Sequence, residues 1–92
     1  MGVKIKFMSA LKEVTGSAEV VLDASFDTYG KIMEELIRLF PRLKEEIFYP
    51  DGTIDYVYQI SLNGQRLSWP EDKDVRVKNA DQIVFMVFMS GG

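Results

Sequence analysis

The sequence has 92 residues, of which 47% are hydrophobic and 12% aromatic, which is enough for one packed domain and too little for two. Its 11 basic and 14 acidic residues give a net charge of −3, and the basic residues are scattered singly. This argues against nucleic acid as the primary ligand, because phosphate binding needs clustered cations. The chain has no cysteine and no histidine, which excludes disulfides, thiolate catalysis, histidine-activated nucleophiles and the usual zinc sites.

Targeting and metal-binding signals are also missing from the sequence. No apolar run approaches the roughly 20 residues that cross a bilayer, and the first residues lack the apolar stretch of a signal peptide. We therefore expect a cytoplasmic protein with no membrane partner. The acidic pairs Glu34-Glu35 and Glu45-Glu46 are not expected to bind metal, because adjacent helical side chains point about 100° apart.

The first third of the chain predicts two strands and a short helix between them. Residues 3–7 alternate apolar and charged side chains, which indicates a half-buried strand. Residues 9–14 carry apolar side chains at helical spacing and are followed by Gly16, so we expect one or two helical turns that end there. Residues 18–22 form a second strand, which we expect to pair antiparallel with the first.

The main helix is predicted in the next segment. Asp27 and Thr28 are candidate N-caps, and Pro41 ends the pattern. The apolar stripe of this helix consists of Ile32, Leu36, Leu39 and Phe40. A further short turn is predicted at 43–48, followed by a loop at 49–52.

The last third predicts the remaining strands. Residues 54–62 alternate again, Asn63-Gly64 is typical of a hairpin turn, and 65–68 forms the return strand. Residues 69–74 are predicted as a loop and 78–82 as a turn. Residues 83–88 are continuously apolar, which favours a central strand parallel to the first. The expected fold class is α+β, with a mixed four- to five-stranded sheet and one main helix packed on one face.

Alternation assigns side chains to the two faces of this sheet. The helix is expected to cover the face that carries Val3, Ile5, Phe7, Tyr56, Tyr58, Ile60 and Leu62. The opposite, open face then carries Lys4, Lys6, Met8, Val57, Gln59 and Ser61. Alternation alone cannot show which face of the last strand is buried, because its side chains are apolar on both faces. We assign Ile83, Phe85 and Val87 to the core, and Val84, Met86 and Phe88 to the open face.

An apolar patch on the open face is typical of a docking site. The alternative is that the outward set packs under a loop or against another copy of this chain.

The sequence ends in Gly91-Gly92, a pair expected by chance in about 0.5% of chains because glycine averages about 7% of residues. Together with the opening strand and residues 7–13, the Ser61-Leu62-Asn63-Gly64 hairpin and residues 79–84, this ending resembles the MoaD/ThiS family of sulfur carriers. The resemblance covers nearly the whole chain. Val87-Phe88-Met89 stands where the MoaD branch often has a Pro-Pro pair, and Ala80 stands where a glycine is usual.

The resemblance implies a β-grasp (ubiquitin-like) domain over 1–88 and a flexible tail over 89–92. It implies that a ubiquitin-activating-type enzyme adenylates Gly92 with ATP, after which Gly92 becomes a thiocarboxylate, while this chain binds no cofactor itself. Because glycine has no Cβ, Gly91 and Gly92 suit insertion into a narrow active site. The implied second partner is the large subunit of molybdopterin synthase. The surface that meets both partners is expected to comprise Met8, Val84, Met86, Phe88, Met89 and Ser90.

Three alternatives remain open at this point. In the first, the chain is a ubiquitin-like modifier that is joined through Gly92 to lysines of target proteins. In the second, it carries sulfur for the thiolation of tRNA or of a thiamine precursor. In the third, it is an interaction module with an inert tail.

Overall fold

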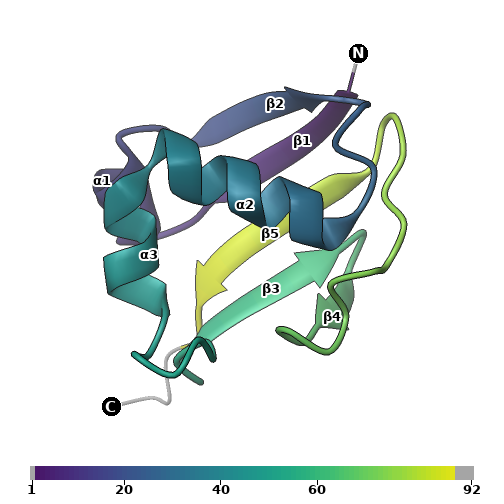
Figure 1. Cartoon of the computed structure of the whole chain (residues 1–92). Coiled ribbons are helices and arrows are strands. Elements are labelled where there is room, and N and C mark those ends of the chain that lie inside the picture. Colours follow the sequence, from purple (N-terminus) through teal and green to yellow (C-terminus); the bar gives the residue numbers. More distant parts are fainter. Residues whose placement is uncertain (1, 89–92) are drawn as a thin grey trace.

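The computed structural model describes residues 2–88. Its elements, in chain order, are β1 (Gly2–Phe7), α1 (Leu11–Thr15), β2 (Glu19–Asp23), α2 (Tyr29–Leu39), α3 (Pro41–Ile47), β3 (Tyr58–Leu62), β4 (Gln65–Leu67) and β5 (Gln82–Val87). The strands form one five-stranded sheet in the order β2-β1-β5-β3-β4 (Figure 1). Strand β5 pairs parallel with β1, and the other neighbours are antiparallel. The expected mixed sheet, with its last strand beside its first, is confirmed.

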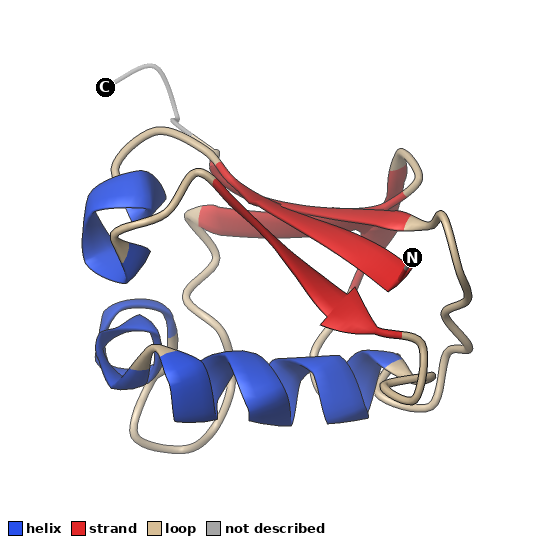
Figure 2. Ribbon diagram, turned by 90° about the horizontal axis from the view of Figure 1, so that it is seen from above, coloured by secondary structure: helices blue, strands red, loops and turns tan. Residues whose placement is uncertain are grey.

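The helices leave one face of the sheet open. Figure 2 shows α2 running along the other face, and the core lies between α2 and the strands. Fully or almost fully buried side chains come from β1, α1, α2, α3 and β5; they include Val3, Ile5, Phe7, Leu11, Ile32, Met33, Leu36, Leu43, Ile47, Ile83 and Phe85. Sheet alternation thus confirms the predicted inward set of β1.

Helix α2 begins where predicted, but its buried stripe includes Tyr29 and Met33, which were not predicted, and leaves out Leu39. The Thr28 hydroxyl accepts a hydrogen bond from the Lys31 backbone N–H at 3.2 Å, so Thr28 is the N-cap. The buried positions are 29, 32, 33 and 36, and Phe40 continues the same row against the core. Leu39 falls outside this row and is 41% exposed, so its predicted place in the core is wrong.

Strand β3 begins four residues later than the alternation predicts. The Asp55 Oδ1 atom accepts a hydrogen bond from the Val57 N–H, and the Tyr58 N–H bonds the Asp55 carbonyl. This aspartate-capped turn interrupts the extended chain before Tyr58. Tyr56 is therefore 76% exposed, and its predicted place under the helix is wrong.

The predicted turns are confirmed where special backbone conformations are required. Helix α1 ends at Gly16 with a φ of 76°. Asn63 and Gly64 have φ values of 49° and 89°, which suits a two-residue hairpin between β3 and β4.

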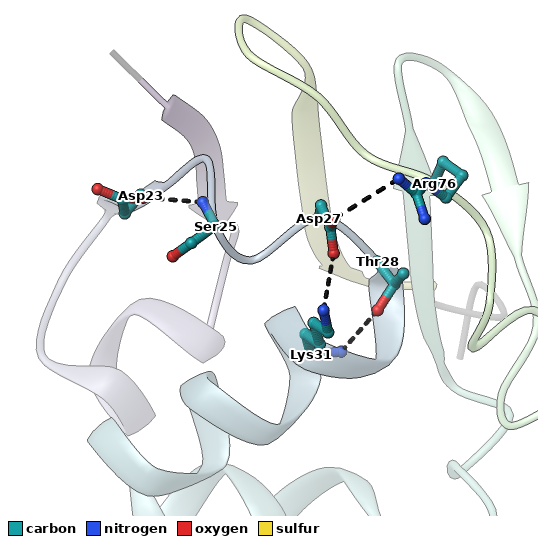
Figure 3. A network of polar contacts seen from close by, with 6 residues as sticks. All are labelled: Asp23, Ser25, Asp27, Thr28, Lys31 and Arg76. Atoms are coloured by element: carbon teal, nitrogen blue, oxygen red, sulfur yellow. Dashed lines mark hydrogen bonds and ion pairs between the residues drawn. The ribbon is translucent and has the colours of Figure 1, made fainter.

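A polar network ties the start of α2 to the segment that leads into β5 (Figure 3). The Asp27 carboxylate lies 3.0 Å from Lys31 Nζ and 3.6 Å from an Arg76 guanidinium nitrogen. The Asp27 carbonyl also accepts a hydrogen bond from the Val77 N–H at 3.0 Å. The exposed ion pairs contribute little energy, so the backbone bond is the firmer part of this link.

Candidate functional site

The end of β5 is the part of the structure that leads toward the predicted functional tail. Met89, Ser90, Gly91 and Gly92 lie outside the described residues. The strand itself is held on both sides. The Met8 N–H donates to the Phe85 carbonyl at 2.9 Å, and the Phe88 N–H donates to the Val57 carbonyl. Val87, which ends β5, and the following Phe88 are therefore fixed to the body of the domain.

The two faces of β5 confirm the orientation that was chosen for it. Ile83 and Phe85 are buried, and Val87 packs against the core. Val84 and Met86 point to the open face, where they are half-buried, while Phe88 is 58% exposed. Met8, which follows β1, is 44% exposed. The predicted docking residues inside the described chain are therefore accessible, and their docking role stays a prediction.

Strand register sets the neighbours of this apolar stripe. Val84 lies between Lys6 of β1 and Ser61 of β3, and Ser61 in turn pairs with Arg66 of β4. Ser61 was predicted to be exposed on the open face, but it is buried. Its side chain is the shortest in this row, so its longer neighbours shield it.

The open face also carries charge. Lys4, Lys6 and Arg66 lie on it together with Glu19 and Asp23, and Glu19 is 4.0 Å from Lys4. Charges of both signs therefore flank the apolar stripe that crosses the middle of the sheet.

A second group of side chains near the end of β5 was not among the functional residues predicted from the sequence. Tyr49 and Tyr56 flank the turn that precedes β3, and both are exposed. Burial and the neighbouring Asp55 carboxylate raise the pKa of Tyr49. Burial, together with a 2.6 Å hydrogen bond to Glu46, raises the pKa of Tyr58 to about 12. Tyr49 and Tyr58 therefore remain protonated at neutral pH. The Tyr49-Pro50-Asp51-Gly52 turn was recognised, but alternation hid the turn at Asp55.

The beginning of β5 is held by a cluster around Asp81. Its two carboxylate oxygens accept hydrogen bonds from Asn63 Nδ2 and from the Lys78 N–H, each at 2.9 Å. Asn63 Oδ1 accepts a further bond from the Gln82 N–H. Burial opposes ionisation of Asp81, but these hydrogen bonds outweigh it and lower the pKa. The cluster joins the β3–β4 hairpin to the start of β5.

Residues 2–88 contain neither a carboxylate cluster suited to a metal ion nor a membrane-spanning helix. No group of three or more aspartate or glutamate side chains lies close enough together to hold a metal ion. Within the same range, no helix is both long and apolar enough to cross a bilayer.

Comparison with known proteins identifies the family. The model of the ThiS family matches residues 5–92. No curated protein sequence matches this chain.

Several solved structures share the fold. The crystal structure of SAMP1 from Haloferax volcanii is 25% identical, with a TM-score of 0.80 over 98% of each chain. The solution structure of small archaeal modifier protein 1 (SAMP1) from Methanosarcina acetivorans is also 25% identical; it covers 98% of this chain and 95% of that one, with a TM-score of 0.76. A putative molybdopterin converting factor, subunit 1, from Pyrococcus furiosus is 22% identical, with a TM-score of 0.71 over 95% of this chain and 97% of that chain, and shows the fold alone. The chain therefore belongs to the ThiS family, within the β-grasp, ubiquitin-like group of sulfur carriers and modifiers.

Proposed function

We propose that this chain carries sulfur as a thiocarboxylate on Gly92 and donates it in molybdopterin biosynthesis, as the small subunit of molybdopterin synthase. The observation that carries the proposal is the ThiS family match, which extends through Gly91 and Gly92. The proposal takes Gly92 as the carboxyl terminus. It also places the chain in the cytoplasm.

The proposed chemistry needs an activated carboxylate. A free α-carboxylate has a pKa of about 3.5, is ionised at neutral pH and is a poor electrophile. A ubiquitin-activating-type partner would join Gly92 to the AMP part of ATP and release pyrophosphate. Hydrosulfide then attacks the carbonyl and expels AMP, so that one carboxylate oxygen leaves with AMP and sulfur takes its place. The ATP belongs to the partner enzyme.

The open face supplies the proposed docking surface for this reaction. Met8 and Phe88 are exposed near the end of β5, and Val84 and Met86 extend the apolar stripe across the sheet. Methionine side chains adapt to more than one partner, which suits a carrier that must meet both an adenylating enzyme and the large synthase subunit. Met89 and Ser90 complete the proposed contact next to Gly91.

A second candidate function is protein modification. It is favoured by the 25% identity to SAMP1, the small archaeal modifier protein 1. In this case the activated Gly92 carbonyl is attacked by a lysine amine of a target protein, and an isopeptide bond forms. The two functions share the activation step and differ only in the acceptor.

A comparison of wild-type chain with the Gly92-deleted chain tests the proposal. With ATP, a candidate adenylating enzyme and radiolabelled sulfide, the wild-type chain is expected to bind label and pass it to a pterin precursor in the presence of the large subunit. The shortened chain should keep its melting temperature and lose transfer entirely. Transfer by the shortened chain would contradict the proposal. Gly92-dependent conjugates of higher mass in cell extract, without labelled pterin, would favour the modifier instead.

A further inference from the structure

A second surface lies beside the end of β5, where it adjoins the open face of the sheet and shares Phe88 with it. It consists of Tyr49, Asp51, Asp55, Tyr56 and Phe88, and we call it the exit surface. Tyr49 is 43% exposed, and Tyr56 and Phe88 are still more exposed. Figure 1 shows the segment between α3 and β3 at the same end of the molecule as the end of β5. Exposed aromatic side chains are common at the energetic centres of protein interfaces.

Hydrogen bonds hold the exit surface in one shape. Asp51 Oδ1 accepts from the Thr53 N–H at 2.9 Å and from the Thr53 hydroxyl at 2.7 Å. The Asp55 N–H donates to the Ile47 carbonyl at 2.8 Å, which anchors the turn to α3. The bond between Phe88 and Val57 joins the turn to the end of β5. The exit surface is therefore preorganised and continuous with the strand that leads to the tail.

A groove adjoins the exit surface and enlarges its apolar area. It has a volume of about 820 Å³ and runs between α3 and the turn at 49–52. Its apolar lining comes mainly from Ile37, Pro41, Phe48, Tyr49 and Pro50. Asp51 and Glu45 lie along it, and Lys44 is the cation that lines it on the α3 side.

The region around the exit surface is acidic. Residues 45–65 contain four acidic side chains and no basic one, and residues 82–92 contain no charged side chain. The four ion pairs within residues 2–88 do not involve Asp51 or Asp55. The end of β5 therefore lies beside an acidic, aromatic exit surface, and the residues that follow it in the sequence carry no charged side chain.

We propose that the exit surface binds an arginine-bearing segment of the protein that receives the tail. The identity of that protein rests on the proposed function, whereas the preference for arginine rests only on the side chains of the exit surface. A guanidinium group is planar, pairs with carboxylates and stacks on tyrosine rings, so it fits both kinds of side chain found here. The open face carries charges of both signs beside its apolar stripe. A partner that meets both surfaces would therefore be oriented by the acidic exit surface.

The first test uses a probe that is independent of any partner enzyme. Isotope-labelled chain is titrated with the peptide acetyl-Gly-Arg-Gly-Arg-Gly-amide, and backbone amide shifts are followed by NMR. We expect saturable shifts at residues 49–57 and at Phe88, weaker shifts with lysine in place of arginine, and none with citrulline. Absence of shifts at these residues, or equal shifts with citrulline, would overturn the proposal.

The variant for this test is D51N/D55N. Asparagine keeps the Oδ1 acceptors that the turn needs, so the fold is retained while two charges are removed. The matched control is E34Q/D74N, which removes the same charge from exposed positions elsewhere. Loss of two exposed ion pairs is expected to weaken peptide binding by about 2-fold to 30-fold at low salt. The control should bind like wild type, and an equal loss in the control would show a net-charge effect and refute the assignment.

The second test uses the candidate adenylating enzyme and measures pyrophosphate release. D51N/D55N is expected to raise the KM for the carrier with little change in kcat. The difference should shrink in 1 M salt, where the screening length falls to about 3 Å. An unchanged KM at low salt would overturn the docking role. If wild-type chain is not adenylated at all, the proposed function fails, and the peptide titration still decides whether the exit surface binds arginine.

Discussion

Disruption of the Asn63–Asp81 contact is expected to loosen the start of β5 by an amount that a double-mutant cycle can measure. The cycle uses D81A, N63G and the double variant. Glycine is chosen at position 63 because the backbone there has a φ of 49°, which glycine adopts readily. Any remaining backbone effect is the same in both backgrounds and cancels in the cycle.

The magnitude follows from the hydrogen bonds around Asp81. Its carboxylate accepts two bonds, from Asn63 Nδ2 and the Lys78 N–H, each 2.9 Å long. A hydrogen bond to a charged group contributes about 1.5–3 kcal/mol, so D81A should lower the free energy of unfolding by about 3 kcal/mol or more. The cycle isolates the bond that Asn63 and Asp81 share, for which we expect a coupling energy of about 1.5 kcal/mol.

The coupling should depend on pH in one direction. The pKa of Asp81 is lowered in the folded chain. A carboxylate with a lowered pKa stabilises the fold fully above its unfolded pKa of about 3.9, and this contribution disappears as the pH falls through the lower folded value. The coupling energy should therefore be constant from about pH 5 to 8 and decline below about pH 4.

Urea unfolding followed by the fluorescence of the single tryptophan, Trp69, measures all four proteins. The control D74A removes an exposed carboxylate from the same loop and should change stability by less than about 0.5 kcal/mol. A coupling energy under about 0.5 kcal/mol at pH 7, or one that persists unchanged to pH 3, would refute the reasoning.

Four further substitutions test the packing and the faces. Phe7→Ala removes a buried ring that lies 5.7 Å from Phe40 and 5.4 Å from Phe85, so unfolding should become easier by about 3–5 kcal/mol, and a wild-type urea midpoint would contradict its burial. Leu36→Ala should cost about 2–5 kcal/mol while Leu39→Ala costs under about 1 kcal/mol; similar losses would restore the stripe predicted from sequence. Met86→Arg should weaken docking to the adenylating enzyme by at least tenfold with little change in melting temperature, and a collapse of the melting temperature would mean that Met86 is a core residue.

The sheet was predictable because its signals are local and repetitive. Alternation over residues 3–7 identified the buried side of β1, and the doubly apolar run at 83–88 identified a central strand. The Asn63-Gly64 pair and Gly16 specified turns through their tolerance of positive φ. These strands and turns depend only on residues that are close together in the sequence, so the residue pattern is sufficient to predict them.

The errors arise where a side chain competes with the local period. At 54–57 the residues alternate like a strand, but the Asp55 carboxylate captures the Val57 N–H and turns the chain, which exposes Tyr56. In α2 the sequence offers Leu39 and Phe40 as neighbours, and only the packing direction of the helix decides that Phe40 faces the core.

The long-range features of the candidate site had no local signal. Asn63 and Asp81 are separated by 18 positions, and each was assigned to its own turn. The exit surface depends on the bond between Phe88 and Val57, which joins segments far apart in the sequence. Pairing of this kind is a property of the sheet topology. The residue pattern identifies the strands but not the surfaces that their ends build together.

The central claim concerns the chemistry of Gly92, and one mass measurement tests it most directly. The chain is incubated with ATP, a sulfur source and a candidate adenylating enzyme, and is then alkylated with a thiocarboxylate-selective reagent. Replacement of oxygen by sulfur adds nearly the same mass as oxidation of one of the five methionines, so the label must be mapped to the C-terminal fragment. We predict a single label on Gly92. An unlabelled Gly92 found joined to lysines, or unlabelled and unmodified with every adenylating enzyme tried, would contradict the claim.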